Sequence, residues 1–265
     1  MSQTDKMQSR KDGRVGYVIF NNPERHNAVS LDMWQAAGEM LADFASDPNI
    51  TVVVVTGAGG KAFVSGADIS KFEKERSSED AVANYNAVVD KSYSAFYDFP
   101  KPTIAMIRGY CIGGGMGLAT CCDLRIATEG SKFAVPAAKL GLGYGYAGLK
   151  RLVDVVGPSF AMEIFYTARQ FTAAEAREMG LVNRIVPDAP GELENYVKSY
   201  AEMIAGNAPL TIGAVKETVH QVIVEDSKRN LKRSVEMVDA CFKSKDYTEG
   251  RKAFMEKRKP VFTGS

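Results

Sequence analysis

Hydrophobic positions in the first half of the chain alternate between short continuous runs and longer amphipathic segments. Continuous apolar runs predict strands at residues 15–20, 50–56 and 102–107, and spaced apolar positions predict helices at 31–45 and 81–99. The run at 50–56 is almost entirely β-branched, which is typical of a strand buried on both faces. Strands that alternate with helices in this way predict an α/β core built from βα crossovers.

The second half of the chain is dominated by helical patterns. Short strands are predicted at 124–127, around 133–135 and at 182–186, with a glycine-rich loop at 141–148 and helices at 158–168, 172–179 and 193–205. No true internal repeat is visible. We therefore expect a disordered tail over 1–12, an α/β core over 13–205 and a helical C-terminal region over 206–265.

Composition and charge exclude several classes of protein. Lys and Arg number 33 against 32 Asp and Glu, so nothing indicates a nucleic-acid partner. No apolar run approaches 18 residues and the polar N-terminus does not resemble a signal peptide, so we expect a cytoplasmic protein without membrane contact. The cysteines lack CxxC spacing and are expected to be buried free thiols: Cys111, Cys121, Cys122 and Cys241.

Candidate chemistry begins at three consecutive glycines, Gly113 to Gly115. They lie between the strand at 102–107 and a small apolar segment at 116–122 that reads as a helix. Glycines let a ligand approach the backbone, and a helix N-terminus presents unpaired N–H groups to a negatively charged oxygen. A tight packing turn explains the same residues equally well. A second such segment, Gly66-Ala67-Asp68, follows the strand at 50–56, so two backbone anion sites are predicted at strand ends.

Other common kinds of site fit the sequence poorly. The segment 143–148 matches G-x-G-x-x-G, but no strong strand precedes it and no acidic residue ends a second strand. Neither His26 nor His220 has the surroundings of a hydrolase base, and both read as surface or structural residues. No His, Cys and carboxylate cluster has metal-ligand spacing, so no metal is expected.

Several ordered motifs together resemble the crotonase (enoyl-CoA hydratase/isomerase) superfamily, from about residue 13 to the C-terminus. They are Asn27-Ala28, Phe63-x-x-Gly66-Ala67-Asp68, Pro102-x-Ile104-Ala105-x-Ile107-x-Gly109, Gly113-Gly114-Gly115, Cys122-Asp123-Leu124-Arg125-Ile126-Ala127, the runs within 165–169, 173–176 and 180–183, and the ending at 249–260. The resemblance implies a spiral of ββα units, a C-terminal helical trimerisation region, and a homotrimer or a hexamer made of two trimers.

The same resemblance implies a substrate and a set of residues that bind it. The substrate is an acyl-CoA thioester, with coenzyme A as part of the substrate and no tightly bound cofactor. Its carbonyl oxygen would lie between the N–H groups of Ala67 and Gly114. The implied substrate-binding residues are Arg25, Ser65, Gly66, Asp68, Ile69, Lys71, Gly113, Phe254 and Lys257. For each lysine or arginine, a solvated surface position is an equally good interpretation.

The sequence departs from the family where hydratases carry two glutamates. Those positions read Gly117 and Ala137, and a third acid–base position of some isomerases and dehalogenases reads Gly145. Tyr144 resembles the tyrosine that family decarboxylases present towards the thioester, although a loop tyrosine that packs its ring is an equal alternative. A known decarboxylase branch carries histidine where this chain has Ala67. Other polar side chains that could reach the site are Ser65, Glu73, Glu75 and Lys139.

The sequence therefore predicts a lyase or isomerase on CoA thioesters that stabilises a thioester enolate and does not use paired glutamates. Ordinary hydration is doubtful because water addition needs an acid and a base, each worth about 10²–10⁴-fold in rate. Two alternatives stay open: an acyl-CoA decarboxylase that uses Tyr144, and a non-catalytic acyl-CoA-binding protein.

Overall fold

A six-stranded sheet forms the centre of the computed structural model, which describes residues 4–68, 71 and 78–265. Its strand order is β1-β2-β3-β5-β7-β10, and every neighbouring pair is parallel except β1 with β2. The strands are β1 (Met7–Asp12), β2 (Val15–Phe20), β3 (Val52–Gly57), β5 (Thr103–Ile107), β7 (Leu124–Thr128) and β10 (Arg184–Val186).

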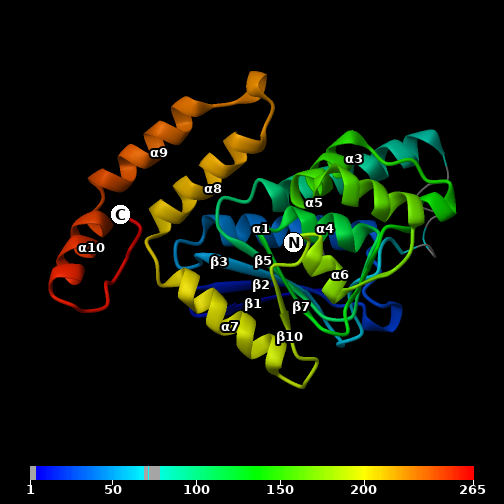
Figure 1. The fold of residues 1–265 in the computed structure, drawn as a ribbon, viewed down its shortest axis with the longest axis horizontal. Helices are drawn as coiled ribbons and strands as arrows, with labels where there is room; N and C mark the ends of the chain where they lie inside the picture. The colour runs from blue at the N-terminus through cyan, green and yellow to red at the C-terminus, as the bar shows by residue number, and fades with distance from the viewer. Residues whose placement is uncertain (1–3, 69–70, 72–77) are drawn as a thin grey trace.

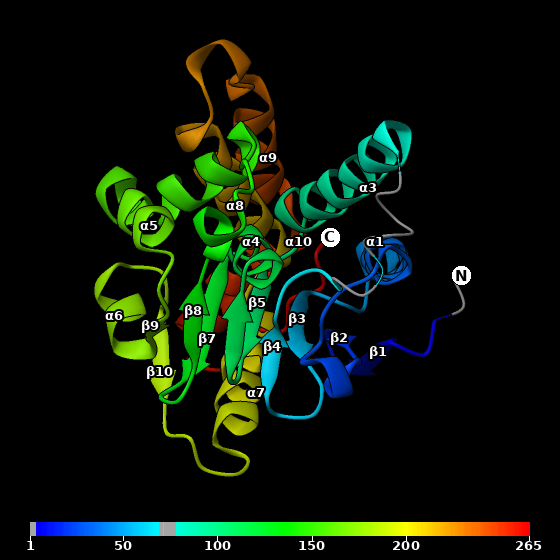
Figure 2. The same ribbon diagram turned by 90° about the vertical axis from the view of Figure 1, so that its right-hand side faces the viewer.

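A smaller sheet lies beside it with the order β4-β6-β8-β9. Its strands are β4 (Ala62–Val64), β6 (Tyr110–Ile112), β8 (Lys132–Ala134) and β9 (Phe171–Thr172). Successive strands alternate between the sheets, since β3, β5 and β7 belong to the large sheet and β4, β6 and β8 to the small one. Each such pair precedes a helix, which confirms the predicted ββα units (Figure 2).

Helices cover both faces of the large sheet (Figure 1). In β3, Val53 and Val55 join the core under the helices α1, α3, α4 and α5, whereas Val52 and Val54 pack against α7 on the opposite face. This double burial confirms the reading of the β-branched run. The helices are α1 (Leu31–Ser46), α3 (Glu79–Tyr97), α4 (Gly114–Cys121), α5 (Tyr146–Thr167), α6 (Ala173–Glu178) and α7 (Glu192–Ala205).

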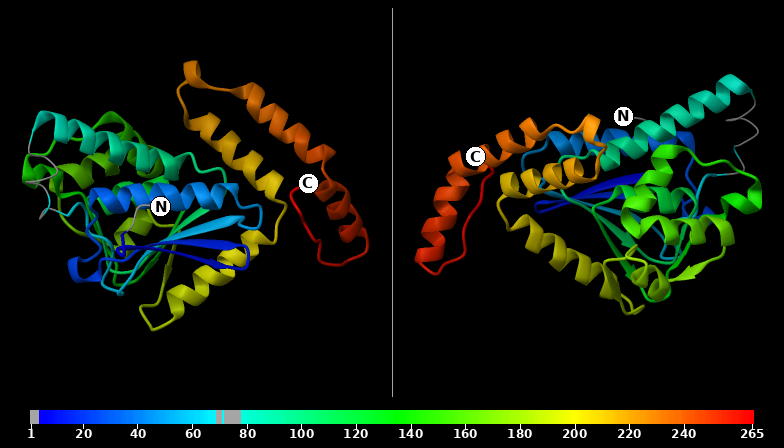
Figure 3. Two further views of the ribbon diagram at one scale, coloured as in Figure 1. Left: turned by 180° about the vertical axis from the view of Figure 1, so that it is seen from behind. Right: turned by 45° about the horizontal axis from the view of Figure 1, so that its top comes forward.

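Three further helices extend from one end of the core (Figure 3). They are α8 (Pro209–Ile223), α9 (Leu231–Lys243) and α10 (Lys245–Met255). Lys216 of α8 attaches this region to the core, because its ammonium lies 2.8 Å from a carboxylate oxygen of Asp123 and donates to the carbonyl of Lys101. Short 3-10 turns cover Pro23–Arg25, Pro136–Leu140 and Asp226–Lys228.

Two sequence-based expectations need correction. Residues 7–12 are not a disordered tail, because β1 pairs along its whole length with β2 and buries Met7. The helical segment expected at 158–168 begins earlier, at Tyr146, and Gly157 interrupts it with φ +75° and ψ 166°. Because residues 141–148 are rich in glycine, the sequence did not predict the first half of α5. Within the described residues, no helix has both the length and the apolar character needed to cross a membrane.

Candidate active site

Two strand ends of the small sheet bring the predicted backbone sites together. Strands β4 and β6 are parallel, with Val64 paired to Cys111, so the chain leaves both strands at the same edge. The segment after β4 contains Gly66, and the segment after β6 contains Gly113 and Gly114. A β carbon on Gly114 would lie 3.6 Å from the Cα of Gly66, so the two segments pack directly against each other.

Left-handed backbone at both segments explains why glycine occupies them. Gly66 has φ +113° and Gly113, which precedes α4, has φ +54°. These values are unfavourable for residues with a β carbon. A bulkier residue here would be strained even where space is available, so the glycines serve backbone conformation as well as close approach. The packing turn is therefore present, and the anion site stays a prediction.

The N–H groups of Ala67 and Gly114 take no part in the hydrogen bonds that the described residues around them form. Val29 forms a parallel bridge with Ala67 through Val29 N–H to Gly66 O and Asp68 N–H to Val29 O, each at 2.9 Å. That bridge does not use the Ala67 N–H. Gly114 is the first residue of α4, where an N–H has no intrahelical acceptor. Within the described part of the chain we find no acceptor for either group.

Buried Asn27 holds the loop that carries Arg25 against these strand ends. Its side-chain amide donates to the carbonyls of Ala58 and Ala62 at 2.9 and 2.8 Å, and its carbonyl oxygen accepts from Asn22 N–H. Ser65 N–H donates to the carbonyl of His26, which lies between Arg25 and Asn27 in this loop. The structure thus brings together the predicted residues on either side of this contact, Arg25 and Ser65.

Charged side chains cluster beside the same segment. An Arg25 guanidinium nitrogen lies 3.3 Å from a carboxylate oxygen of Asp68, whose side chain is buried, whereas that of Arg25 is 53% exposed. Lys71 N–H donates to the carbonyl of Asp68, and the Lys71 ammonium lies 3.9 Å from Asp32. The pair of Lys71 with Asp32 is exposed on both sides and contributes little to stability, so the Lys71 side chain can reorient towards a ligand.

Tyr144 lies beside α4, in a small cavity that Gly117 also lines. The cavity has a volume of about 10 Å³, of the order of one water molecule. Its remaining lining is mostly apolar: Met116, Thr120, Val135, Gly148, Leu152 and Phe165. The ring of Tyr144 packs edge-on against Phe165 with centroids 4.8 Å apart, and burial raises the pKa of its hydroxyl. Tyr144 is therefore a neutral, half-buried phenol next to Gly117.

Tyr93 was not predicted by the sequence, yet it lies beside both Gly114 and Gly117 of α4. Its hydroxyl donates to the carbonyl of Gly114 at 3.0 Å, and its ring packs against Trp34 with centroids 5.0 Å apart. Burial raises its pKa well above the ordinary value, so the phenol stays neutral. A tyrosine within a predicted helix carries no local signal of such a role, since only the packing of α3 on α4 reveals it.

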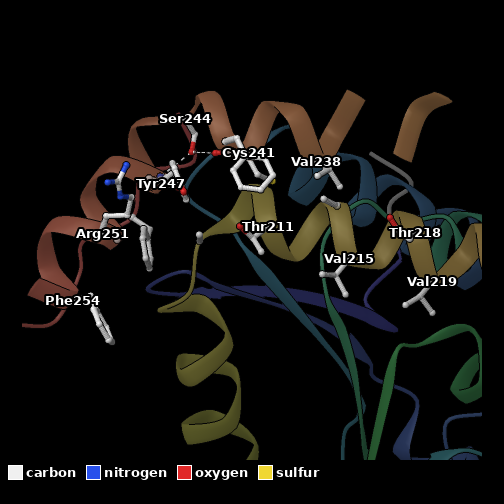
Figure 4. Close-up of a pocket in the computed structure, with 16 residues that line it drawn as sticks. Thr211, Val215, Thr218, Val219, Val238, Cys241, Ser244, Tyr247, Arg251 and Phe254 are labelled. Atoms are coloured by element: carbon white, nitrogen blue, oxygen red, sulfur yellow. Dashed lines mark hydrogen bonds between the residues drawn. The ribbon is translucent and has the colours of Figure 1, made fainter. Parts of the chain in front are cut away.

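Two predicted residues lie elsewhere in the chain. Phe254 belongs to α10 and Lys257 follows it, at the opposite end of the molecule from α3 (Figure 1). Phe254 is 82% exposed and lines an apolar groove of about 820 Å³ between α8 and the helices α9 and α10 (Figure 4). A single chain therefore does not bring Phe254 and Lys257 to the segments around Gly114.

The remaining candidates are either outside the site or outside the described residues. Ile69, Glu73 and Glu75 lie outside the described residues. Ala137 is buried in the core, and Lys139 and Gly145 are exposed. Among the described residues no group of His, Cys, Asp and Glu could hold a metal ion.

The cysteines are free thiols, as predicted. Cys111, Cys121 and Cys122 are buried, and Cys241 is half-buried. Burial raises the pKa of Cys121 to about 12 and that of the other two buried thiols further. These three groups are inert packing residues at neutral pH.

Comparison with known proteins agrees with this architecture. A family model described as enoyl-CoA hydratase/isomerase matches residues 10–265. The chain is 33% identical over 249 residues to a short-chain-enoyl-CoA hydratase of Clostridium acetobutylicum, covering 94% of each chain. It is 34% identical over 252 residues to a crotonyl-CoA hydratase of Syntrophomonas wolfei, covering 95% of each.

A solved structure extends the likeness to three dimensions. The crystal structure of an enoyl-CoA hydratase/carnithine racemase from Magnetospirillum magneticum superposes with a TM-score of 0.93 at 36% identity, covering 99% of this chain and 97% of that one. The fold thus defines the class, a crotonase-like α/β protein. With the sequence matches, it follows that the chain belongs to the enoyl-CoA hydratase/isomerase family.

Proposed function

We propose that this chain binds an acyl-CoA thioester and stabilises its enolate form between the N–H groups of Ala67 and Gly114. The observation that carries the proposal is the packing of Gly66 against Gly114, which sets two unused backbone donors at adjoining strand ends. The relatives named as hydratases of enoyl-CoA substrates support the choice of a CoA thioester. Negative charge that develops on the thioester oxygen is what such donors stabilise.

A pair of substitutions at Gly114 tests this donor directly. Proline is tolerated at the first position of a helix and lacks the N–H, whereas alanine adds a β carbon but keeps the N–H. We expect butyryl-CoA labelled with ¹³C at the carbonyl to show a lowered carbonyl stretching frequency on the wild type and on Gly114→Ala. Gly114→Pro should lose most of that shift. An unchanged spectrum for Gly114→Pro would rule out this donor.

The proton chemistry is proposed not to be that of a two-glutamate hydratase. The resemblance assigns the two carboxylate positions to Gly117 and Ala137, and Ala137 is buried in the core. Neither residue can carry a proton. We expect crotonyl-CoA hydration to be slower than that of a two-glutamate enzyme by about 10²-fold or more, since each acid or base contributes about 10²–10⁴-fold. Hydration near the two-glutamate rate would contradict this.

Decarboxylation is the second candidate, because Tyr144 resembles the tyrosine of family decarboxylases and packs among apolar side chains beside Gly117. An apolar site disfavours the carboxylate of a malonyl-type thioester. The bond between the carboxylate carbon and the α carbon breaks, carbon dioxide leaves, and the electron pair forms the enolate, which then takes a proton at the α carbon. We expect turnover of malonyl-CoA that is lost in Tyr144→Phe. If turnover persists in that variant, Tyr144 has no part in the reaction.

A non-catalytic acyl-CoA binder is the remaining alternative. It keeps the donors at Ala67 and Gly114 and predicts tight binding of acyl-CoA without conversion. A panel of saturated, unsaturated and malonyl-type thioesters, followed by mass spectrometry, separates it from both enzymatic candidates. Binding without any product across the panel would establish the binder.

Self-association through the C-terminal helices is part of the same proposal. Exposed apolar side chains line the groove between α8, α9 and α10, and a contiguous exposed apolar surface of this kind marks a site of interaction with another protein. A second copy would cover the groove and could bring Phe254 and Lys257 to a neighbour's substrate site. We expect a trimer or a hexamer by sedimentation velocity, and Phe242→Asp should shift it to the monomer. A monomeric wild type would contradict this.

A further inference from the structure

Tyr93 lies where a side chain at position 117 would extend. A β carbon on Gly117 would fall 3.0 Å from the Tyr93 hydroxyl oxygen and 3.1 Å from the ring carbon that bears it. Such distances are tighter than ordinary van der Waals contact between carbon and a polar group. The space in front of Gly117 is therefore already taken by a residue from another helix.

The ring of Tyr93 is held at both ends and cannot easily move aside. Its hydroxyl donates to the carbonyl of Gly114, and its ring packs edge-on against Trp34, which is itself buried. What remains open beside Gly117 is the cavity of about 10 Å³ near Tyr144, too small for a carboxylate side chain. A residue longer than glycine at 117 must displace Tyr93.

We propose that Tyr93 is a specificity-determining residue that excludes a carboxylate from position 117 and thereby directs the site away from hydration. The proposal rests on the proposed function, because it assumes that a thioester enolate forms next to Gly114. A neutral phenol that already donates to a backbone carbonyl cannot act as the base that activates water. The site then favours reactions in which a group leaves the α carbon or the α carbon is protonated, with no water added.

Thermal unfolding tests the steric relationship without any assay of activity. We expect Gly117→Ala to lower the Tm in the wild-type background, because the new β carbon meets the Tyr93 ring. In a Tyr93→Ala background the same change should raise the Tm, because alanine favours a helix over glycine. If Tyr93→Ala does not fold, Tyr93→Leu replaces it, since leucine keeps contact with Trp34 but lacks the end of the ring. An equal effect of Gly117→Ala in both backgrounds would overturn the proposal.

Crotonyl-CoA hydration tests the consequence for specificity. We expect the pair Gly117→Glu with Tyr93→Leu to hydrate crotonyl-CoA at least tenfold faster than Gly117→Glu alone. The matched control is Gly117→Glu with Tyr97→Leu, because Tyr97 lies one turn further along α3 and stacks on His220 instead. That control should stay at the Gly117→Glu level.

Two results would overturn the specificity role. The pair Gly117→Glu with Tyr93→Leu could hydrate crotonyl-CoA no faster than Gly117→Glu alone, or no faster than the wild type. Calorimetry with butyryl-CoA and the wild type separates these failures from a failure of the proposed function. Absence of binding there would overturn the proposed function, and with it the role assigned to Tyr93, whatever the Tm values show.

Discussion

A β carbon on Gly115 would lie 2.0 Å from the carbonyl oxygen of Val64. Helix α4 can therefore rest on the end of β4 only because residue 115 has no side chain. This contact joins α4, which follows β6, to β4, which precedes Gly66. The distance between the two backbone segments of the candidate site depends on it.

Gly115→Ala should push α4 away from β4 and weaken both stability and acyl-CoA binding. Overpacking of this kind costs about 1–3 kcal/mol, and a clash with backbone places the cost at the upper end. Urea unfolding measures the loss. Gly38→Ala is the matched control, since Gly38 lies in α1 with open space around it and alanine should stabilise that helix by about 0.5–1 kcal/mol. Equal effects of the two changes would show that α4 adapts freely.

Asn27→Ala should destabilise the loop that carries Arg25. The change leaves the carbonyls of Ala58 and Ala62 without their donor, and unsatisfied buried groups cost about 1–3 kcal/mol. Alanine is also less tolerant than asparagine of the left-handed φ of +55° at this position. We expect a loss of about 3 kcal/mol by urea unfolding, as the sum of these effects. The exposed Asn49→Ala should change stability by less than about 0.5 kcal/mol.

Thiol labelling should distinguish the buried cysteines from the half-buried one. Cys111, Cys121 and Cys122 are at most 3% exposed, and their raised pKa values suppress the reactive thiolate. In the native Phe242→Asp variant near pH 8, in which no second copy covers the groove that Cys241 lines, roughly one thiol per chain, Cys241, should react with a disulfide reagent, and all four should react after unfolding. Rapid labelling of a second native thiol would contradict the packing around α4.

The sequence predicted the parts of this fold that follow from local pattern. Residues 52–55 form a strand because consecutive β-branched side chains suit burial on both faces, and the glycine run marks the start of α4 because only glycine fits the backbone there. Strand β1 escaped prediction because four of its six residues are exposed, so its pairing with β2 depends on backbone bonds and not on an apolar pattern.

The backbone segments of the candidate site could be predicted from the sequence, but the side chains that pack against them from other helices could not. The segments at Gly66 and Gly114 follow strands, so their meeting at one sheet edge follows from parallel pairing. The position of Tyr93 over Gly117 depends on how α3 crosses α4, which no spacing within α3 encodes. Phe254 is a different case, because it lies in α10, at the opposite end of the molecule from α3, and only under the proposed self-association would a second copy bring it to a substrate.

Glu175 makes the stability of the protein depend on pH in the acid range. Its carboxylate accepts from Thr172 N–H and from Arg169, each at 2.7 Å, and these bonds lower its pKa from 4.5 to about 2, with the Thr172 bond as the larger cause. A carboxyl with a lowered folded-state pKa stabilises the fold fully above its unfolded pKa, and the contribution disappears as the pH falls from about 4.5 towards 2.

Glu175→Gln should therefore lower the Tm near neutral pH and have a diminishing effect in acid. Glutamine keeps an oxygen that can accept from Thr172 N–H but loses the charge that pairs with Arg169. Because this pair is partly exposed, we expect a loss of about 0.5–1 kcal/mol, or about 1–4 °C in a chain of this size. The Tm difference between wild type and variant should be widest above pH 5 and should narrow towards pH 3. Glu178→Gln, an exposed change at the other end of α6, should show a constant small difference. A Glu175→Gln difference that does not narrow in acid would mean that the carboxylate's charge contributes nothing and that only its shape caps the helix.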